Sequence, residues 1–174
     1  MRPPAKLTSE SERATQVEVA RKIALDLLSV RQRSAEELRR AMAKRNVPED
    51  VAEEILERFQ DVGLINDAAF AAALTASRSE YSLRGRRRIR QELQAKGVSR
   101  ELADEALASL PPEDERAAAL ALAERRARSL SGLEPHVARR RLMGILARRG
   151  FPGNMVSSVT DEVLGRWTDA DHGC

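Results

Sequence analysis

The sequence is 174 residues long and 33% charged, with 30 lysines and arginines against 27 aspartates and glutamates, and only 3% of its residues are aromatic. This length fits one or two ordinary domains or one repeat array, and the richness in alanine, leucine, arginine and glutamate favours helices over sheets. No apolar run approaches the roughly 20 residues that span a bilayer, and the single cysteine, Cys174, excludes an intramolecular disulfide. We therefore expect a cytoplasmic protein without membrane association.

The first segments of the chain predict an arm followed by helices. Residues 1–14 carry two prolines and no apolar period, which predicts a flexible N-terminal arm. Apolar residues then recur at helical intervals over residues 17–30 and predict a first helix. Ser34 and Glu37 have the spacing of a capping box, which predicts the start of a second helix. A third helix is expected between Pro48 and the glycine at position 63.

The same pattern of helices and stops then occurs twice more. Asn46, Gly97 and Gly150 each end a second helix, and these residue types tolerate positive φ. When the three copies are aligned on these stops, apolar positions coincide: Leu38 with Ile89 and Leu142, and Met42 with Leu93 and Leu146. Chance similarity among helices rich in alanine and leucine is the alternative, but matching stops together with matching apolar positions favour a true repeat.

We therefore predict an all-α fold of three tandem three-helix repeat modules that form an elongated, curved, solenoid-like body. The first helix of the third module begins after the break at Pro111-Pro112. The expected boundaries are residues 15–65, 66–112 and 113–165 for the modules and residues 166–174 for a C-terminal tail that is polar apart from Trp167.

The sequence carries little that indicates catalysis. His136 and His172 are its only histidines, and it has no H-E-x-x-H, C-x-x-C or G-x-S-x-G motif and no phosphate-binding loop. Its carboxylates fall on the outward faces of third helices, where a solvated surface is expected. We therefore predict no enzymatic activity, no cofactor and no metal, and keep a small helical enzyme as a remote alternative.

Basic residues are the stronger indication of function. A cluster crowds the start of the second helix of the middle module, where positive charge opposes the helix dipole. Exposed guanidinium groups around free backbone N–H donors suit phosphates or the carboxylates of a partner, although an arginine-rich solvated face is the alternative. The candidate binding residues in this cluster are Arg84, Arg86, Arg87, Arg88 and Arg90, of which Arg87 and Arg90 should point away from the core.

The second helices of the other two modules are also basic, whereas the third helices of the first two modules are acidic. If the modules stack in parallel, the basic helices form one ridge that suits an extended polyanion or a helical protein assembly with a negative groove. Tyr81 is the only tyrosine and could stack on a base, but packing against the next helix is favoured. The further candidates are Arg39, Arg40 and Lys44 in the first module, and Arg139, Arg140, Arg141 and Arg148 in the third.

The sequence resembles the RecX family of regulatory proteins. The resemblance rests on Gly63-Leu64-Ile65-Asn66-Asp67 followed by Phe70-Ala71, and on Gly85-x-x-Arg88-Ile89-x-x-Glu92-Leu93-x-x-Lys96-Gly97-Val98. The repeats extend it over residues 17–165. Asn66 stands where the family usually has an acidic residue, and Asn46 occupies a common glycine position.

The resemblance implies three modules of three helices without enzymatic activity of their own. RecX proteins bind RecA in the groove or at the growing end of the RecA–DNA filament, and they also bind single- or double-stranded DNA weakly. They suppress ATP hydrolysis, filament extension and strand exchange, which limits recombination, DNA repair and the SOS response. We therefore expect a monomeric modulator of RecA filaments, with a sequence-independent helical DNA-binding adaptor as the alternative.

Overall fold

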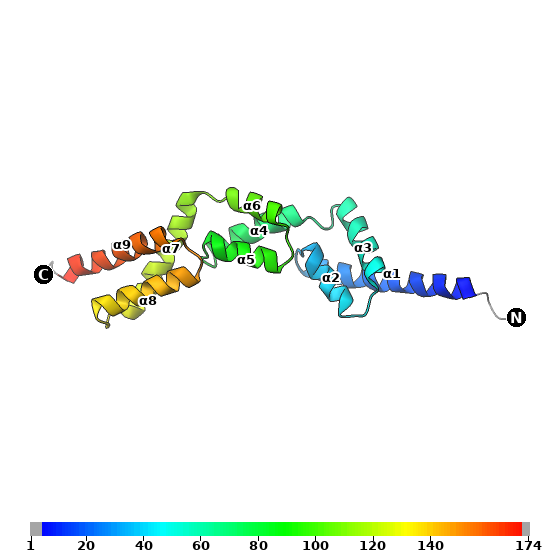
Figure 1. Cartoon of the computed structure of the whole chain (residues 1–174), viewed down its shortest axis with the longest axis horizontal. Coiled ribbons are helices and arrows are strands. Elements are labelled where there is room, and N and C mark those ends of the chain that lie inside the picture. The colour runs from blue at the N-terminus through cyan, green and yellow to red at the C-terminus, as the bar shows by residue number, and fades with distance from the viewer. Residues whose placement is uncertain (1–4, 172–174) are drawn as a thin grey trace. The chain divides into compact units, whose positions relative to one another are not determined.

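The computed structural model describes residues 5–171, which form helices and their connections and contain no strand (Figure 1). This confirms the predicted all-α fold of three tandem three-helix modules. The modules consist of α1–α3, α4–α6 and α7–α9, and a short 3₁₀ helix, η1, follows α7. The helices are α1 (Ala5–Val30), α2 (Ala35–Ala43), α3 (Glu49–Asp61), α4 (Asp67–Glu80), α5 (Arg86–Ala95), α6 (Arg100–Ala108), α7 (Pro112–Ala127), η1 (Arg128–Leu130), α8 (Pro135–Arg148) and α9 (Gly153–Asp171).

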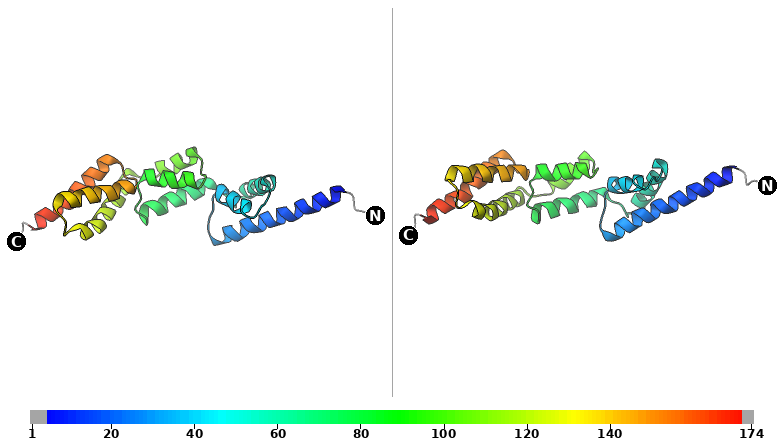
Figure 2. Two further views of the ribbon diagram at one scale, coloured as in Figure 1. Left: turned by 60° about the horizontal axis from the view of Figure 1, so that its bottom comes forward. Right: turned by 90° about the horizontal axis from the view of Figure 1, so that it is seen from below.

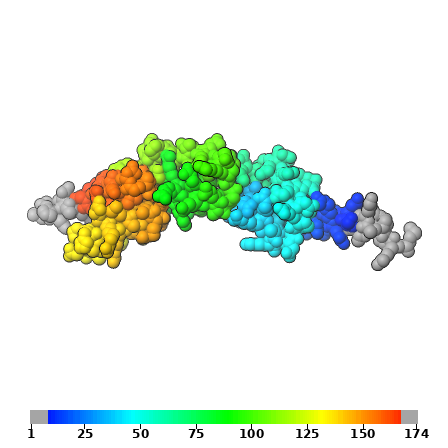
Figure 3. Space-filling model, viewed as in Figure 1, coloured from blue at the N-terminus to red at the C-terminus, as the bar shows by residue number. Residues whose placement is uncertain are grey.

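The chain divides into two compact units, and their boundary runs through the middle module. Unit 1 contains residues 5–70 together with the loop at residues 95–99. Unit 2 contains residues 71–94 and 100–171. Within unit 1, the N-terminal turns of α1 extend beyond α2 and α3 (Figure 2). Within unit 2, the side chains of α7, α8 and α9 form one continuous body (Figure 3). None of the described helices is long and apolar enough to cross a membrane.

Both ends of the chain differ from the sequence prediction. Residues 5–14, predicted as part of a flexible arm, are the first turns of α1. Arg13 in these turns pairs with Asp50 and, at 2.8 Å, with Glu54 of α3. Surface ion pairs of this kind leave no apolar period in the sequence, which explains the error. The predicted tail also begins too early, because α9 continues to Asp171; the side chain of Trp167, and all of His172 and Cys174, lie outside the described residues.

A small aliphatic core holds α1, α2 and α3 together in unit 1. The third helix forms where it was expected and buries five apolar residues on one face, and Asn46 ends α2 with a φ of 57° as expected. Packing of aliphatic side chains is the main stabilising contribution in a module that buries a single phenylalanine on α3. The buried residues of the core are Ala20, Ala24, Ala35, Leu38, Met42, Val47, Val51, Ala52, Ile55, Leu56, Phe59 and Ile65.

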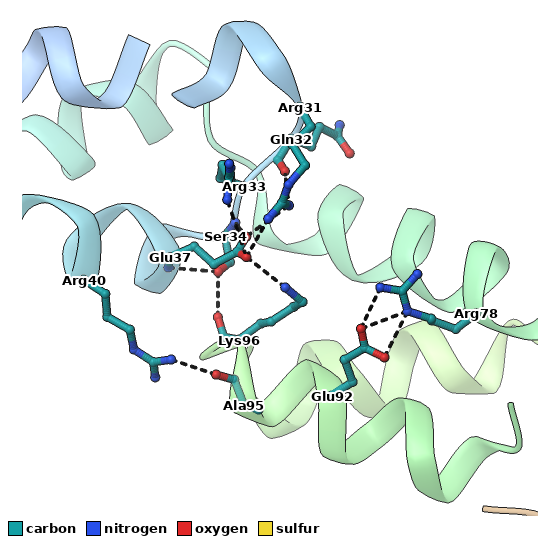
Figure 4. A network of polar contacts seen from close by, with 10 residues as sticks. All are labelled: Arg31, Gln32, Arg33, Ser34, Glu37, Arg40, Arg78, Glu92, Ala95 and Lys96. Carbon is teal, nitrogen blue, oxygen red and sulfur yellow. Dashed lines mark hydrogen bonds and ion pairs between the residues drawn. The ribbon is translucent and has the colours of Figure 1, made fainter. Parts of the chain in front are cut away.

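Ser34 connects the start of α2 to the loop at residues 95–99. Its side chain accepts a hydrogen bond from the backbone N–H of Glu37, and the Glu37 carboxylate accepts one from the backbone N–H of Ser34. These two bonds confirm the predicted capping box. The Ser34 hydroxyl is fully buried and donates to the carbonyl of Lys96 at 2.6 Å (Figure 4). The backbone N–H of Ala35 donates to Asp67 Oδ1 at 2.9 Å. One helix start therefore holds three segments of the chain.

Glu37 extends this cap into an ion-pair network. Its Oε1 accepts from Lys96 Nζ at 2.8 Å and from Arg31 Nη2 at 2.9 Å, and Arg40 Nη1 donates to the carbonyl of Ala95 at 2.9 Å (Figure 4). Burial by itself raises the pKa of Glu37, but the bonds from Arg31 and Lys96 outweigh it and lower that pKa to about 2. The carboxylate is therefore ionised in the folded state well below the pH at which it would protonate in the unfolded chain.

Glu37 should make unit 1 sensitive to acid. Because its folded-state pKa is depressed, its contribution is fully present above the unfolded value near 4.5 and is lost as the pH falls towards 2. At pH 7 the Glu37→Gln variant should have a free energy of unfolding lower by about 2 kcal/mol. The difference should shrink between pH 5 and pH 2 in urea titrations followed by circular dichroism. Glu18→Gln, at an exposed position of α1, is the control, and an identical deficit at every pH would contradict this assignment.

Candidate functional site

The arginine-rich start of α5 lies against the C-terminal end of α8, within unit 2. The backbone N–H of Gly85 donates to the carbonyl of Arg149 at 2.9 Å. The two segments of backbone approach so closely that a Cβ on Gly85 would lie 2.4 Å from the oxygen of Gly150. A Cβ on Gly150, which has a φ of 90°, would lie 2.4 Å from the nitrogen of Arg88. The carbonyl end of one helix thus faces the N–H end of another, which satisfies backbone groups that helix ends leave free.

A buried carboxylate from the third module caps α5. The backbone N–H of Arg86 donates to Glu115 Oε1 at 2.9 Å, and the Arg86 guanidinium lies 3.2 Å from Glu115 Oε2. The same guanidinium donates to the carbonyl of Leu110. Glu115 is only 6% exposed, and the Arg86 side chain that it binds is half-buried. The crowding of positive charge at this helix start is therefore compensated by Glu115, and Arg86 is a structural residue.

Half of the predicted binding residues are neutralised within the chain. Arg90 is exposed as expected, but its Nη2 donates to Asp104 Oδ1 at 2.7 Å. Ion pairs of this kind, within a helix or between neighbouring helices, neutralise many of the arginines that appear basic in the sequence. The paired candidates are Arg84 with Glu92, Arg86 with Glu115, Arg90 with Asp104, Arg39 with Glu36 and Glu53, Arg40 with Glu36, and Arg139 with Asp161.

The other half form no ion pair among the described residues. Arg88 reaches only Gln91, at 3.5 Å. Because Gly150 packs on the backbone of Arg88, the start of α5 lies next to the basic end of α8. The candidates without an ion pair are Arg87 and Arg88 on α5, Arg140, Arg141 and Arg148 on α8, and Lys44 at the end of α2 in unit 1.

The positive charges of Arg84, Arg125 and Arg126 act on Arg149, and we call these four residues the arginine cluster. Arg149 Nη1 donates to the carbonyl of Ser82 at 2.7 Å, which fixes its side chain. Burial lowers the pKa of Arg149, and the positive charges of Arg84, Arg126 and Arg125 lower it further. Arginine nevertheless stays charged, so the protein holds several like charges close together. An anion bound among them would relieve this repulsion.

Part of this cluster was not predicted from the sequence. Arg125 and Arg126 lie in the last turn of α7, a first helix, whereas the prediction considered only second helices. The run Glu-Arg-Arg-Ala-Arg at 124–128 was the available signal. Tyr81 was expected to pack against the next helix, but it is 77% exposed in the loop that also supplies the Ser82 carbonyl. An aromatic ring therefore stands open to solvent beside the cluster.

The chemistry of this surface is that of binding. Guanidinium groups with exposed N–H donors recognise phosphate and carboxylate groups through charge and paired hydrogen bonds. Within the described residues, no group of three or more histidine, cysteine, aspartate or glutamate side chains is placed to hold a metal ion. The arginine cluster is thus a candidate surface for an anionic partner, and the unpaired Arg87 and Arg88 are further candidates at the start of α5.

Comparison with known proteins places all three modules in one family. Family models match the first three-helix domain of RecX at residues 20–59, the second at 66–107 and the third at 113–160. Each match falls inside one of the three expected modules. The chain is 43% identical over 148 residues to the regulatory protein RecX of Streptomyces coelicolor, covering 85% of this chain and 79% of that protein. It is 36% identical over 162 residues to the RecX of Amycolatopsis mediterranei, covering 93% and 90%.

Solved structures agree with the fold. The crystal structure of RecX from Lactobacillus salivarius superposes with a TM-score of 0.76 at 23% identity, over 86% of this chain and 97% of that one. A second crystal structure of a regulatory protein RecX gives a TM-score of 0.80 at 25% identity, over 92% of this chain and 79% of that one. The helical architecture described above is therefore shared with experimentally determined structures.

Gly85 should be indispensable to the junction of α5 and α8. A methyl group at this position would overlap backbone atoms of Gly150 and Phe151, which cannot move aside as a flexible side chain would. Gly85→Ala should therefore lower the free energy of unfolding by about 2 kcal/mol or more. In the matched control, Gly132→Ala, the added Cβ meets nothing within 4 Å, and the change should stay within about 0.5 kcal/mol. Thermal unfolding of both variants would measure this difference, and equal midpoints would contradict the close approach.

Proposed function

The chain belongs to the RecX family, and from this premise we propose that it is a non-catalytic regulator that binds RecA and RecA–DNA filaments. Its proposed effect is to inhibit ATP hydrolysis, filament extension and strand exchange, and so to modulate recombination, DNA repair and the SOS response. The regulatory names of the relatives and the match of all three modules support this proposal.

At the level of residues, the proposal rests on the positive charge of arginine side chains in unit 2 that no carboxylate in the described part of the chain neutralises. Arg125, Arg126 and Arg149 form no ion pair with a carboxylate among the described residues, although the chain contains 27 acidic residues. A filament of protein and DNA offers both phosphates and carboxylates as counter-charges. Binding to such an assembly would supply the anions that this surface lacks.

Inhibition would follow from a difference in affinity between filament states. A protein that contacts neighbouring subunits shifts the filament towards the state in which these contacts form best. The three modules provide helical surfaces that recur along the chain, which suits a partner that is itself periodic. Hydrolysis and extension require the subunits to change state, so a bound regulator that favours one state would slow both.

The arginine cluster should be required for binding to filaments. Replacing Arg125 and Arg126 by glutamine removes two positive charges from the cluster and keeps helix propensity. We expect the double variant to bind preformed RecA–single-stranded-DNA filaments at least about fivefold more weakly, and to inhibit ATP hydrolysis correspondingly less. Fluorescence anisotropy of labelled protein and a coupled ATPase assay would provide the two measurements.

The control for this experiment carries the same change in net charge. Arg21→Gln with Arg58→Gln removes two exposed arginines that pair with Glu18 and Glu54 inside unit 1. This variant should bind as the wild type does. Unchanged hydrolysis at saturating, demonstrably bound wild-type protein would contradict the inhibitory function itself, whereas equal loss in both double variants would contradict the assignment to the cluster.

A sequence-independent DNA-binding adaptor is the alternative function, and the exposed Tyr81 beside the arginine cluster is the observation that favours it. Such a protein would bind naked DNA tightly, and the logarithm of its association constant would fall steeply with the logarithm of the salt concentration. Binding to filaments and to naked DNA should be compared at one salt concentration. We expect tighter binding to the filament, and the reverse order would favour the adaptor.

A further inference from the structure

A groove in unit 2 lies between α4 and α7, on side chains that play no part in the arginine cluster. Its volume is about 560 Å³. Its lining residues follow one another at intervals of three and four positions on each helix, so each helix presents one continuous stripe to the groove. These stripes consist of Ala72, Thr75, Ala76 and Ser79 on α4, and of Ala117 and Ala118 on α7.

The helix walls of the groove carry mostly small side chains, and Leu83, Leu110 and Pro111 add apolar surface from the neighbouring loops. Alanine, serine and threonine allow a second helix to approach the walls closely, because the distance between packed helices depends on the side chains at their contact. Ala76 and Ala117 are exposed at the rim, whereas Ala118 is buried at the base. A recess of this shape between two helices fits the apolar face of a third helix.

Thr75 gives a second, independent indication of a ligand. Its side chain lines the groove and is only 3% exposed, and its hydroxyl has no hydrogen-bond partner. Buried hydroxyl groups in folded proteins are normally bonded, because leaving one without a partner is unfavourable. None of the described residues pairs with the Thr75 hydroxyl, so a polar group of a bound partner would satisfy it.

The charged residues that line the groove are acidic. Glu80 at the end of α4 and Asp114 at the start of α7 are both exposed, and neither forms an ion pair among the described residues. The whole chain has a formal net charge of +3, so this negative rim is a local exception. Carboxylates repel phosphate groups and attract lysine and arginine, which favours a cationic protein segment over nucleic acid as the occupant.

We infer that this groove is a docking site for a basic amphipathic α-helix of a partner protein. The apolar side chains of that helix lie between α4 and α7, and its lysine or arginine side chains pair with Glu80 and Asp114. The identification of the partner as the filament protein rests on the proposed function. The inference that the groove binds a basic helix does not depend on that function. The molecule thus has two docking surfaces of opposite charge in one unit.

A synthetic peptide tests the groove without the filament. The probe is a fluorescein-labelled helix of leucine, alanine and lysine with an apolar stripe, compared with a scrambled peptide of the same composition that lacks the stripe. The wild-type protein should bind the striped peptide. Two variants should bind it at least tenfold more weakly by fluorescence anisotropy: Ala76→Trp, whose side chain fills the groove, and the double variant Glu80→Lys with Asp114→Lys, which reverses its charge. Ala73→Trp is the matched control, since Ala73 is exposed on the same helix but does not line the groove. No binding, equal binding of both peptides, or equal binding by all variants would overturn the inference.

Competition then identifies the partner. Excess striped peptide should displace the wild-type protein from RecA–DNA filaments, whereas the scrambled peptide should not. If the wild type binds filaments and the striped peptide displaces none of it, the filament protein is not the occupant. If the wild type binds no filament, the proposed function fails, and the direct peptide titration still decides whether the groove is a docking site. If the wild type forms a dimer at high concentration and Ala76→Trp abolishes that dimer, the occupant of the groove is a second copy of the chain. This result would overturn the assignment to a different partner protein.

Discussion

The architecture of unit 2 depends on the contact of two helix ends at Gly85 and Gly150. Neither position leaves room for a side chain, and the Gly85 N–H donates to the carbonyl of Arg149 at 2.9 Å. The carbonyl end of α8 thereby offsets the positive charge at the start of α5, which would otherwise oppose the helix dipole. Glu115 adds a buried carboxylate at the same point. Because of these contacts, the protein can place several arginines close together on a folded surface.

Much of the fold could be predicted from the sequence, because it depends on local patterns. The apolar spacing of Ile89 and Leu93, the capping box at Ser34 and the positive φ of Asn46 are all encoded within a few residues. The ends of the chain were not predictable in this way, since α1 is continued by the pairing of Arg13 with α3, between residues far apart in the sequence. The curvature of the body and the stacking of its basic helices stay predictions.

The candidate site was only partly predictable, because the sequence shows how many charged residues there are but not which of them form ion pairs in the folded protein. Arg90 and Arg87 look alike in the sequence, yet Arg90 pairs with Asp104 and Arg87 forms no ion pair among the described residues. Arg125 and Arg126 were overlooked because they come from a different helix of the repeat. The groove between α4 and α7 could not have been foreseen either, since its stripes of alanine and serine read as ordinary helical surface. Which residues remain available to a partner is therefore decided by tertiary packing.

The loop at residues 95–99 has a consequence for how such a repeat can be shortened. Unit 1 is not contiguous in the sequence, because this loop belongs to it while most of α5 and all of α6 belong to unit 2. A fragment that ended after α3 would leave the buried Ser34 hydroxyl and the Glu37 carboxylate without the Lys96 groups that they bind. Cutting the chain at the apparent boundary of the first module therefore exposes a buried hydroxyl and removes a charge partner, which would destabilise the fragment. The capping box itself lies within α2, but the partner of its buried serine hydroxyl comes from the following module.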